Sequence, residues 1–382
     1  MTLSSVALVR CDNYDPEAVY GALKRGAELL GGLDRFVRPG ERILLKPNIL
    51  AGDAPERAVT THPSVLAGTV RLFRAGGASL VFGDSPGMEN AVHAARGSGL
   101  QEAGIRAGAE LGEFGAGRTL ENPEGSLVSS LPIAQAVHAC DGLVNLPKLK
   151  THQLTRITGA VKNPFGCIPG KRKALYHVQF QDVLEFSGFL AELSLRLKPR
   201  LHVMDAIVAM EGNGPRNGTP KALRVLIMSD DPVAVDATAC RILDMDPEFV
   251  PTTVMGHEAG LGHYRADDIQ VLGDPLESFV RPDFAAVRKP VYNNASYAYY
   301  NSIKNLVVPR PVIDAKKCAT CGLCAQACPV PGKALRFEDG NRDRPPVYDY
   351  DACIRCYCCQ EMCPVGAIDR KTPLLGRVLR LG

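Results

Sequence analysis

Eight cysteines near the end of this 382-residue chain fall into two runs of the same spacing. The first run occupies 318–329 and the second 353–364, and each reads Cys-x2-Cys-x2-Cys-x3-Cys-Pro. Thiolates are the ligands of iron–sulfur clusters, and three of them at this spacing can wrap three corners of a cubane from one tight loop. The fourth precedes a proline that turns the chain away, so it is free to reach another cluster. The runs therefore predict two [4Fe–4S] clusters.

The crossed ligand pattern of such paired runs assigns each cysteine to one cluster. One cluster is expected to be held by Cys318, Cys321, Cys324 and Cys363, and the other by Cys328, Cys353, Cys356 and Cys359. Zinc is less favoured because it ordinarily uses two separated pairs of ligands. Disulfides are less favoured because they suit short secreted chains. Cys358 lies out of register inside the second run, and we interpret it as a passenger beside the cluster.

The bulk composition is that of a globular protein, with 46% hydrophobic and 22% charged residues. Lys and Arg number 44 against 41 Asp and Glu, so no charge excess points to nucleic acid or to anionic membranes as partners. The longest uncharged stretch, 125–140, is too short to span a bilayer and contains Pro132. The first residues do not resemble a signal peptide, and five cysteines lie outside the motif positions, so we expect a cytoplasmic location.

Apolar runs typical of strands alternate with helical patterns along most of the chain. Strands are predicted at 5–10, 42–45, 79–82, 142–146, 224–228 and 269–272, and helices at 15–30, 61–74, 90–106, 181–197 and 233–243. This alternation predicts an α/β fold, a mainly parallel sheet with helices on both faces. In such sheets ligands bind in the loops after the carboxyl ends of the strands.

Four regions follow from composition and motif positions. We expect an α/β body at 1–280 with a pocket for an anionic ligand, and a linker rich in proline and tyrosine at 281–311. A small α+β ferredoxin-like domain is expected at 312–370, and a short tail at 371–382.

Two basic segments follow the strand predicted at 142–146. The first is Pro-Lys-Leu-Lys-Thr-His at 147–152, and the second is Thr-Gly-Ala-Val-Lys-Asn-Pro-Phe-Gly at 158–166. Ammonium, hydroxyl and amide groups at a strand end can all donate hydrogen bonds to an anion. The alternative is a solvated basic loop, but small and apolar residues separate these lysines, which favours a binding site.

A glycine-rich loop at 211–218 does not match a dinucleotide-binding motif. Its spacing is Gly-x-Gly-x-x-x-Gly, and a strand is predicted after it where the motif requires a helix. A tight turn explains this loop as well as a ligand site does, and Glu211 and Asn213 are its candidate binding residues. No flavin or nicotinamide motif is visible elsewhere.

The combination of motifs resembles an iron–sulfur family known as domain of unknown function 362. The resemblance rests on Lys-Pro-Asn at 46–48, the two basic segments, the Glu-Gly-x-Gly-Pro loop at 211–215 and the C-terminal cysteine runs. It covers about 6–368 and implies architecture more than activity. The body is also distantly similar to lactate-racemase-like proteins, which bind a nickel–pincer nucleotide, and no catalytic residue carries over from them.

The leading hypothesis is a ferredoxin-dependent reductase of a small unsaturated carboxylate or phosphate. Electrons would enter from a redox protein such as a ferredoxin and pass through the clusters, and His152, as proton donor, would act with Lys150 and Lys162. The substrate-binding candidates are Lys46, Asn48, Lys148, Thr151, Asn163, Glu211 and Asn213. An electron-transfer or adaptor subunit and a non-redox isomerase with accessory clusters remain alternatives, and the sequence leaves a homodimer open.

Overall fold

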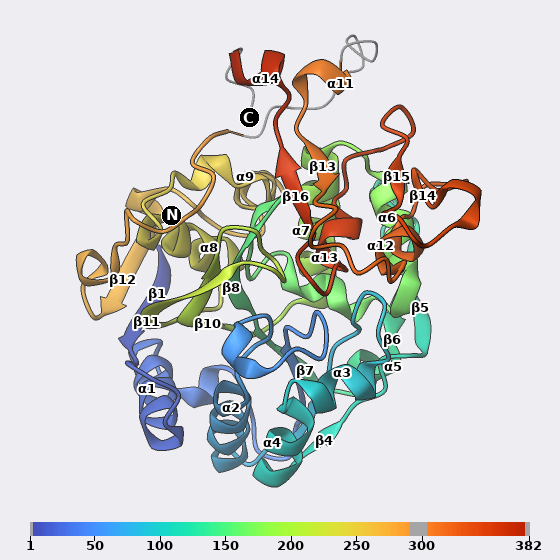
Figure 1. Cartoon of the computed structure of the whole chain (residues 1–382). Coiled ribbons are helices and arrows are strands. Elements are labelled where there is room, and N and C mark those ends of the chain that lie inside the picture. Colours follow the sequence, from blue (N-terminus) through green and yellow to red (C-terminus); the bar gives the residue numbers. More distant parts are fainter. Residues whose placement is uncertain (1–2, 291–303, 379–382) are drawn as a thin grey trace.

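A ten-stranded mixed sheet forms the centre of the α/β body (Figure 1). The computed structural model describes residues 3–290 and 304–378. The main path of the sheet has the order β12-β1-β11-β10-β7-β2-β3-β4, and β8 and β9 extend from β10. The strands are β1 (Ser4–Arg10), β2 (Arg42–Pro47), β3 (Ser79–Phe82), β4 (Ala109–Leu111), β7 (Gly142–Leu146), β8 (Lys148–His152), β9 (Arg156–Thr158), β10 (Leu201–Glu211), β11 (Thr219–Ser229) and β12 (Ile269–Gly273).

The sheet is mainly parallel. The neighbours β10, β7, β2, β3 and β4 all run in one direction, and β12 is parallel to β1. Along the main path only β11 is antiparallel, to both β1 and β10. The predicted α/β class is therefore confirmed, and the antiparallel strands β11 and β9 make the sheet mixed.

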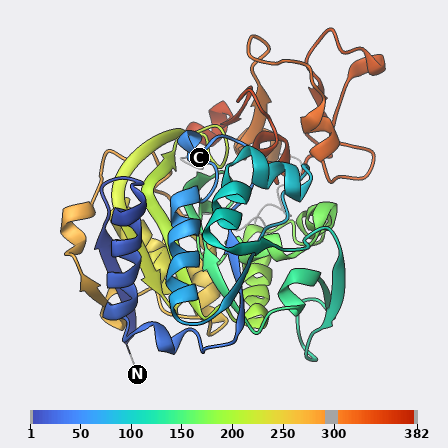
Figure 2. The ribbon, with the colours of Figure 1, turned by 90° about the horizontal axis from the view of Figure 1, so that it is seen from below.

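Helices cover both faces of this sheet (Figure 2). They are α1 (Pro16–Leu29), α2 (Pro63–Ala75), α3 (Ala91–Gly97), α4 (Leu100–Ala107), α5 (Gln135–His138), α6 (Lys173–Gln179), α7 (Val183–Leu197), α8 (Pro232–Ile242) and α9 (Pro251–Glu258). Alternate residues of β2 show the two faces: Ile43 and Leu45 pack beneath α1 and α2, whereas Leu44 packs on the side of α7. Burial on both faces explains why the central strands are almost wholly apolar.

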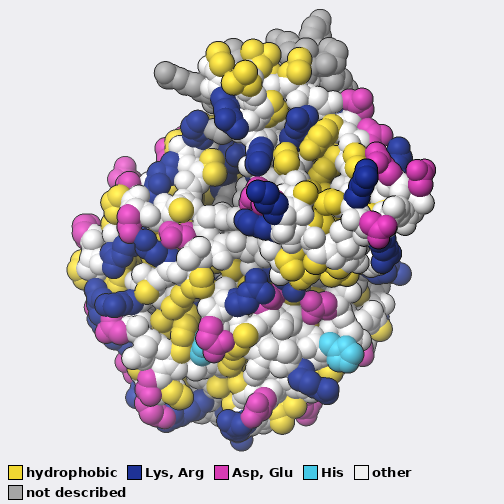
Figure 3. Space-filling model, in the orientation of Figure 1, with side chains coloured by type: hydrophobic (Ala, Val, Ile, Leu, Met, Phe, Trp, Pro, Cys, Tyr) yellow, Lys and Arg dark blue, Asp and Glu magenta, His cyan; other side chains and the backbone are white. Residues whose placement is uncertain are grey.

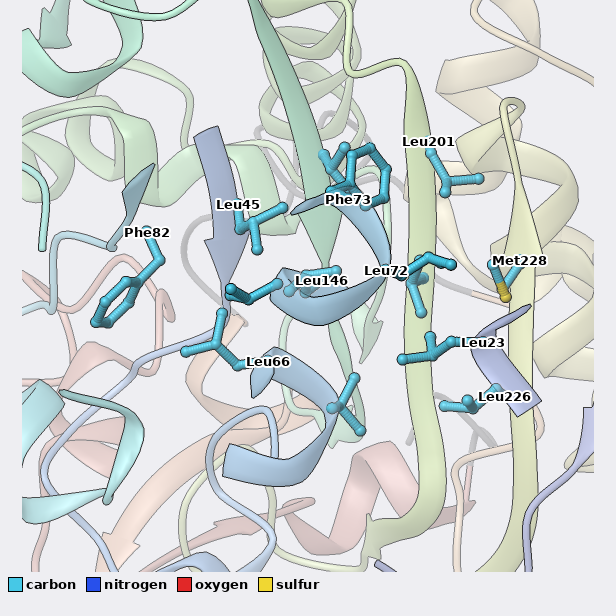
Figure 4. Close-up of a cluster of buried hydrophobic side chains, with 14 of the residues drawn as sticks. Leu23, Leu45, Leu66, Leu72, Phe73, Phe82, Leu146, Leu201, Leu226 and Met228 are labelled. Atoms are coloured by element: carbon cyan, nitrogen blue, oxygen red, sulfur yellow. The ribbon is translucent and has the colours of Figure 1, made fainter. Parts of the chain in front are cut away.

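The larger of the two principal cores lies between α1, α2 and the sheet (Figure 4). Leu23 and Leu66 project from the helices toward Leu146 and Leu226 of the strands, and all four are fully buried. Side chains of this size each stabilise the fold by about 1.5–3 kcal/mol when buried. This core fixes the strand ends on which the candidate site is built.

Short polar side chains determine where the helices begin. Asp15 accepts hydrogen bonds from the backbone N–H groups at the start of α1, and Asp182 and Asp231 do the same for α7 and α8. One predicted helix is wrong in extent: 90–106 forms two helices, α3 and α4, instead of one. Gly99 separates them with φ of 74°, a left-handed conformation that ends a helix.

A small C-terminal domain packs against the body. It contains β13 (Arg310–Ile313), α12 (Leu323–Ala327), β14 (Leu335–Arg336), β15 (Val347–Tyr348), α13 (Cys358–Glu361) and β16 (Ile368–Lys371). Pairing of β13 with β16 and of β14 with β15 gives the expected α+β architecture. Short helices α11 (Lys304–Val307) and α14 (Leu374–Val378) flank it, and β5 (Gly117–Glu121) and β6 (Ser130–Ala134) form a hairpin on the body.

The loop between β10 and β11 joins the two domains. Asn213 donates to Ile368 O at 3.1 Å and to Asp369 Oδ1 at 2.6 Å, and Asn217 donates to Cys363 O at 2.9 Å. Gln360 of α13 donates back to Asn213 Oδ1 at 2.8 Å. Figure 3 shows Lys and Arg side chains gathered over the upper middle of the visible face and mixed with Asp and Glu side chains over its lower part.

Candidate functional site between the two domains

The carboxyl ends of β2 and β3 and the segment after β9 meet at one edge of the sheet. Lys46 is the last side chain but one of β2, and its buried Nζ contacts Asp84 Oδ1 at 2.8 Å and Asn163 Oδ1 at 3.0 Å. Asn48 donates to the same oxygen of Asn163 at 3.0 Å. Asn163 in turn donates to Asn145 Oδ1 at 2.7 Å. Lys46, Asn48 and Asn163 therefore lie together in one hydrogen-bonded network at the carboxyl end of the sheet.

Gly166 lets the segment after β9 lie directly on this network. A Cβ atom at this position would overlap Asp84 Oδ1 and would lie 2.7 Å from Lys46 Nζ. The backbone N–H of Ser85 also donates to Gly166 O at 3.1 Å. A side chain at Gly166 would therefore push apart the buried pair formed by Lys46 and Asp84.

We expect Gly166→Ala to lower the free energy of unfolding by about 1–3 kcal/mol, the usual range for overpacking a tight site. Gly21→Ala is the matched control, since a Cβ atom there meets nothing within 4 Å on α1. That substitution should be neutral or stabilising by about 0.5–1 kcal/mol. Chemical denaturation followed by circular dichroism measures both. Equal stabilities of the two variants would contradict the close approach at Gly166.

A cavity of about 130 Å³ opens beside this network, between the body and the ferredoxin domain. From the body it is lined by Lys46, Asn48, Ile49, Leu50, Asp84, Ser85, Pro86, Gly87, Met88, Thr158, Lys162, Asn163, Phe165, Gly166, Lys173, Ala174 and His177. From the ferredoxin domain it is lined by Ala327, Cys358, Glu361 and Met362. The cavity therefore lies where a bound molecule would contact both domains.

Three lysines face this cavity in different states. Lys46 is paired with Asp84, and Lys173 Nζ donates to the carbonyl oxygens of Ser85 and Ile168 at 2.8 and 2.9 Å. The side-chain nitrogen of Lys162 has neither a hydrogen bond nor an ion pair within 3–290 and 304–378. Burial lowers its pKa, although Glu361 opposes this effect. Of the three lysines, Lys162 is thus the one whose side chain is available to pair with a bound anion.

His152 lies outside the cavity but contacts a residue that lines it. Its Nδ1 accepts hydrogen bonds from the backbone N–H groups of Leu154 and Thr155 at 3.1 and 3.3 Å, so the ring proton belongs on Nε2. Nε2 lies 2.8 Å from Glu361 Oε1 on α13. Burial disfavours the charged carboxylate, but His152 and Lys162 outweigh it and lower the pKa of Glu361 to about 2. This contact fastens the ferredoxin domain to β8.

The basic segment 148–152 is a buried strand, β8, and not the loop that the sequence predicted. Lys148 donates to Asp205 Oδ2 and to the Tyr14 hydroxyl, both at 2.8 Å. Thr151 donates to Gly212 O at 3.0 Å and so holds the β10–β11 loop. Lys148, Thr151 and their neighbour Lys150 do not line the cavity. The carboxylate and carbonyl partners of this strand come from distant parts of the chain, which is why its burial was not visible in the sequence.

Lys150 does not line the cavity but is hydrogen-bonded to a residue that does. Its Nζ donates to Asn48 Oδ1 at 2.7 Å and to Val59 O at 2.6 Å. Burial is the main cause that lowers the pKa of Lys150 to about 7, and Lys162 adds to it. Lys150 therefore orients Asn48, which does line the cavity.

The depressed pKa of Lys150 has a consequence for stability. Between about pH 7 and the 10.5 of an exposed lysine, the unfolded chain binds this proton more tightly than the folded one. The penalty for burying the charge is complete below pH 7 and disappears as the pH rises through this window, so stability increases with pH. Between pH 6.5 and 9.5 we expect the wild-type protein to gain up to about 3 kcal/mol relative to Lys150→Met, since one unit of pKa difference corresponds to about 1.4 kcal/mol. Denaturation of both proteins at pH 6.5 and 9.5 measures the difference, and parallel pH profiles would contradict it.

Glu211 and Asn213 lie away from the cavity. Glu211 Oε2 accepts a hydrogen bond from the backbone N–H of Ala285 at 2.8 Å and lies 3.9 Å from Lys221 Nζ. Asn213 bonds to the ferredoxin domain, as described above. The glycine loop at 211–218 thus makes contacts within the protein, and neither residue is brought near Lys162 or Asn163.

The first set of cysteines surrounds a small cavity of its own. Cys318, Cys321 and Cys324 line it together with Cys363 from the second run, which is the crossed grouping. The backbone N–H of Ala367 donates to Cys363 Sγ at 3.2 Å, a bond that favours a thiolate. These four thiols are the donor set that the crossed pattern requires for one cubane.

Three members of the second set, Cys353, Cys356 and Cys359, lie close together. Burial raises the pKa of the Cys359 thiol, and the nearby thiols of Cys356 and Cys353 raise it further. The Tyr348 hydroxyl donates to Cys359 Sγ at 3.3 Å. Cys328, the remaining member, is buried directly after Ala327, which lines the interdomain cavity. Cys328 and Cys359 of this set are therefore each adjacent in sequence to a residue that lines the interdomain cavity, Ala327 and Cys358.

Several residues of the site were not anticipated. Asp84 follows the strand predicted at 79–82, so the rule for strand ends could have found it. His177 and Glu361 belong to α6 and α13, and no local pattern marks either one. Asp236 of α8 is buried and accepts hydrogen bonds from the backbone N–H groups of Ala160 and Val161, which precede Lys162, at 2.5 and 3.1 Å. Burial raises its pKa to about 7.

A covered α/β sheet with a 4Fe–4S ferredoxin-type domain closing over a lysine-lined cavity defines a two-domain iron–sulfur protein. Residues 310–364 match the 4Fe-4S dicluster domain, and residues 43–241 match the family described as "Domain of unknown function (DUF362)". The chain belongs to the DUF362 family.

Known proteins similar to the chain include one curated relative and two solved structures. A "Thylakoid-associated protein" of Synechocystis sp. is 35% identical over 279 residues, which are 73% of this chain and 86% of the relative. The lactate racemase apoprotein from Thermoanaerobacterium thermosaccharolyticum is 8% identical with a TM-score of 0.37, covering 60% of this chain and 55% of that one. A Thermotoga maritima protein is 14% identical with a TM-score of 0.35, covering 59% and 57%. The matches thus span little more than half of each solved chain.

Within 3–290 and 304–378, none of the helices combines the length and apolar character needed to cross a bilayer.

Proposed function

We propose that this protein is an iron–sulfur oxidoreductase that reduces a small unsaturated carboxylate or phosphate in the interdomain cavity. The observation that carries the proposal is the composition of the cavity wall. Lys162 and Asn163 line it from the body, and Cys358 and Glu361 line it from the helix that also contains Cys359, a candidate cluster ligand. A bound anion would therefore lie beside both a free cation and a source of electrons.

Two [4Fe–4S] clusters, held by the crossed cysteine sets, would supply electrons one at a time. Cys321 of the first set is exposed at the surface, whereas Cys328 and Cys359 of the second are buried toward the body. This arrangement supports entry of electrons near Cys321 from a redox protein such as a ferredoxin. Transfer to the cavity would then start from the second set. The free thiols outside the motif positions agree with a reducing, cytoplasmic compartment.

The body residues would bind and polarise the substrate. Lys162 would pair with its carboxylate or phosphate, and the amide groups of Asn48 and Asn163 would complete the polar wall. Lys150 would act through Asn48, and His152 through Glu361, because each is one contact removed from the cavity. Reduction of a carbon–carbon double bond consumes two electrons and two protons, and the electrons require two molecules of reduced one-electron carrier.

Anaerobic turnover tests this proposal. The protein with its clusters intact is mixed with reduced ferredoxin and with crotonate, fumarate or phosphoenolpyruvate, and oxidation of the ferredoxin is followed by its absorbance. Reduction of at least one probe, with two ferredoxins oxidised per product, is the expected result. Binding without oxidation of ferredoxin would contradict the reductase. Activity in an isomerisation assay that survives Cys356→Ala would instead favour a non-redox enzyme with accessory clusters.

A further inference from the structure

His177 on α6 is a histidine that the proposed function leaves unused. Its side chain lines the interdomain cavity and is 7% exposed. The ring stacks on Phe186 at 4.4 Å between centroids and meets the edge of Phe165 at 5.9 Å. Two aromatic side chains thus fix the plane of the ring, as a ligand-contacting group requires.

The ring nitrogens of His177 have no hydrogen-bond partner within the described parts of the chain. They are not among the fully enclosed polar atoms that lack a partner, so they have access to the cavity. Other histidines of the body differ: His62 and His152 each accept a backbone N–H through Nδ1. A buried polar group left without a partner destabilises a fold, and phenylalanine would fill the same aromatic slot without that cost.

Lys162 provides the second unpartnered group in this cavity. It is close enough to His177 to influence its charge, together with Glu361 and His152. Burial, opposed by Glu361 and assisted by Lys162, lowers the pKa of His177 to about 4. The ring is therefore neutral at physiological pH and offers one N–H donor beside the Lys162 ammonium. The cavity lining also includes the apolar side chains of Met88 and Met362.

We propose that His177 and Lys162 together hold the anionic group of the ligand, with its short apolar body against Met88 and Met362. His177 is then a direct ligand contact, and the two methionines favour a carboxylate with a hydrocarbon tail over a fully hydrophilic anion. This inference rests on the proposed function, because it assigns the substrate contact within the same cavity. Neutral imidazole can donate to an oxyanion without adding a second buried charge.

Anaerobic calorimetry with crotonate and with inorganic phosphate tests the assignment on the protein with its clusters. We expect crotonate to bind more tightly than phosphate. His177→Phe should weaken crotonate binding by about ten- to one-hundred-fold, the effect of losing one hydrogen bond to a charged group. His177→Gln keeps a donor and should stay within about three-fold of the wild type. Tyr176→Phe is the matched control on the same helix, since Tyr176 does not line the cavity.

The outcomes separate this inference from the proposed reductase. If His177→Phe binds crotonate as tightly as the wild type, the proposed role of His177 is wrong. The reductase proposal is still supported in that case if the protein oxidises ferredoxin in the presence of crotonate. If the wild-type protein binds crotonate through His177 but does not oxidise ferredoxin, the ligand contact is supported and the reductase proposal is contradicted. Failure of the wild type to bind crotonate overturns the inference. Cluster absorbance and melting temperature, equal to those of Tyr176→Phe, show that each variant is folded.

Discussion

Replacing Cys356 by alanine is expected to remove about half of the iron and to abolish electron transfer to the cavity. In the crossed assignment Cys356 holds the cluster on the side of the body, so its loss leaves the cluster at Cys321 in place. Electrons could then enter the ferredoxin domain but would have no carrier beside the substrate. Iron and sulfide analysis and low-temperature electron paramagnetic resonance of the reduced protein measure the first effect. Ferredoxin oxidation with crotonate or fumarate measures the second.

Cys358→Ala is the matched control, because this cysteine is two residues away and belongs to the same helix as Cys359. Its thiol lines the cavity but is out of register with the ligand spacing. We expect this variant to keep both clusters and their resonance signals. Loss of iron from Cys358→Ala equal to that from Cys356→Ala would show that the register of the second run is different.

The cysteine motif was readable from the sequence because its information is local. Ligand spacing within one loop defines the cluster site, and only the fourth ligand of each run comes from elsewhere. The structure brings Cys363 to the cavity of Cys318, Cys321 and Cys324, as the crossed pattern predicts. The strands β3 and β7 also agree with their predicted bounds, since short apolar runs bounded by turn residues signal buried strands.

The basic segment at 148–152 shows where this reasoning fails. Lysines at alternate positions indicated a strand end that binds an anion, but the partners of Lys148 and Lys150 are Asp205 and Asn48, far away in the sequence. Whether a lysine faces a ligand or a carboxylate of its own protein depends on tertiary contacts. Lys46 and Lys162 illustrate the same limit, since both line the cavity but only Lys46 is neutralised by an aspartate.

The ligand cavity itself could not be predicted because the two domains build it jointly. Glu361 and Met362 lie within the second cysteine run, and their neighbours in the body include His152 of β8 and Gly87 of the loop after β3. No pattern in either domain specifies the docking. It depends on side chains such as Asn213, Asn217 and Gln360, whose hydrogen bonds cross the interface.

Lys162→Met should reduce turnover of the probe substrates by about 10²–10³-fold, the usual effect of removing one donor aimed at developing or bound negative charge. Its stability should be unchanged or higher, because the substitution removes a buried ammonium that has no partner within 3–290 and 304–378. Burial disfavours the charged form of Lys162 and therefore lowers its pKa, and the same unfavourable burial of charge is removed in the methionine variant. Ferredoxin oxidation and denaturant unfolding of one preparation measure both quantities.

Lys46→Met is the contrasting variant that makes this prediction specific. Lys46 faces the same cavity, but its loss leaves Asp84 as a buried charge without its lysine, which typically lowers the free energy of unfolding by about 3–5 kcal/mol. Removal of a structural lysine thus lowers the free energy of unfolding, whereas removal of a ligand-binding lysine lowers turnover. Equal destabilisation of the two variants would place Lys162 in the framework instead of the binding site. If Lys162→Met is stable and binds and reduces the probe substrates as the wild type does, Lys162 has no role in the proposed mechanism.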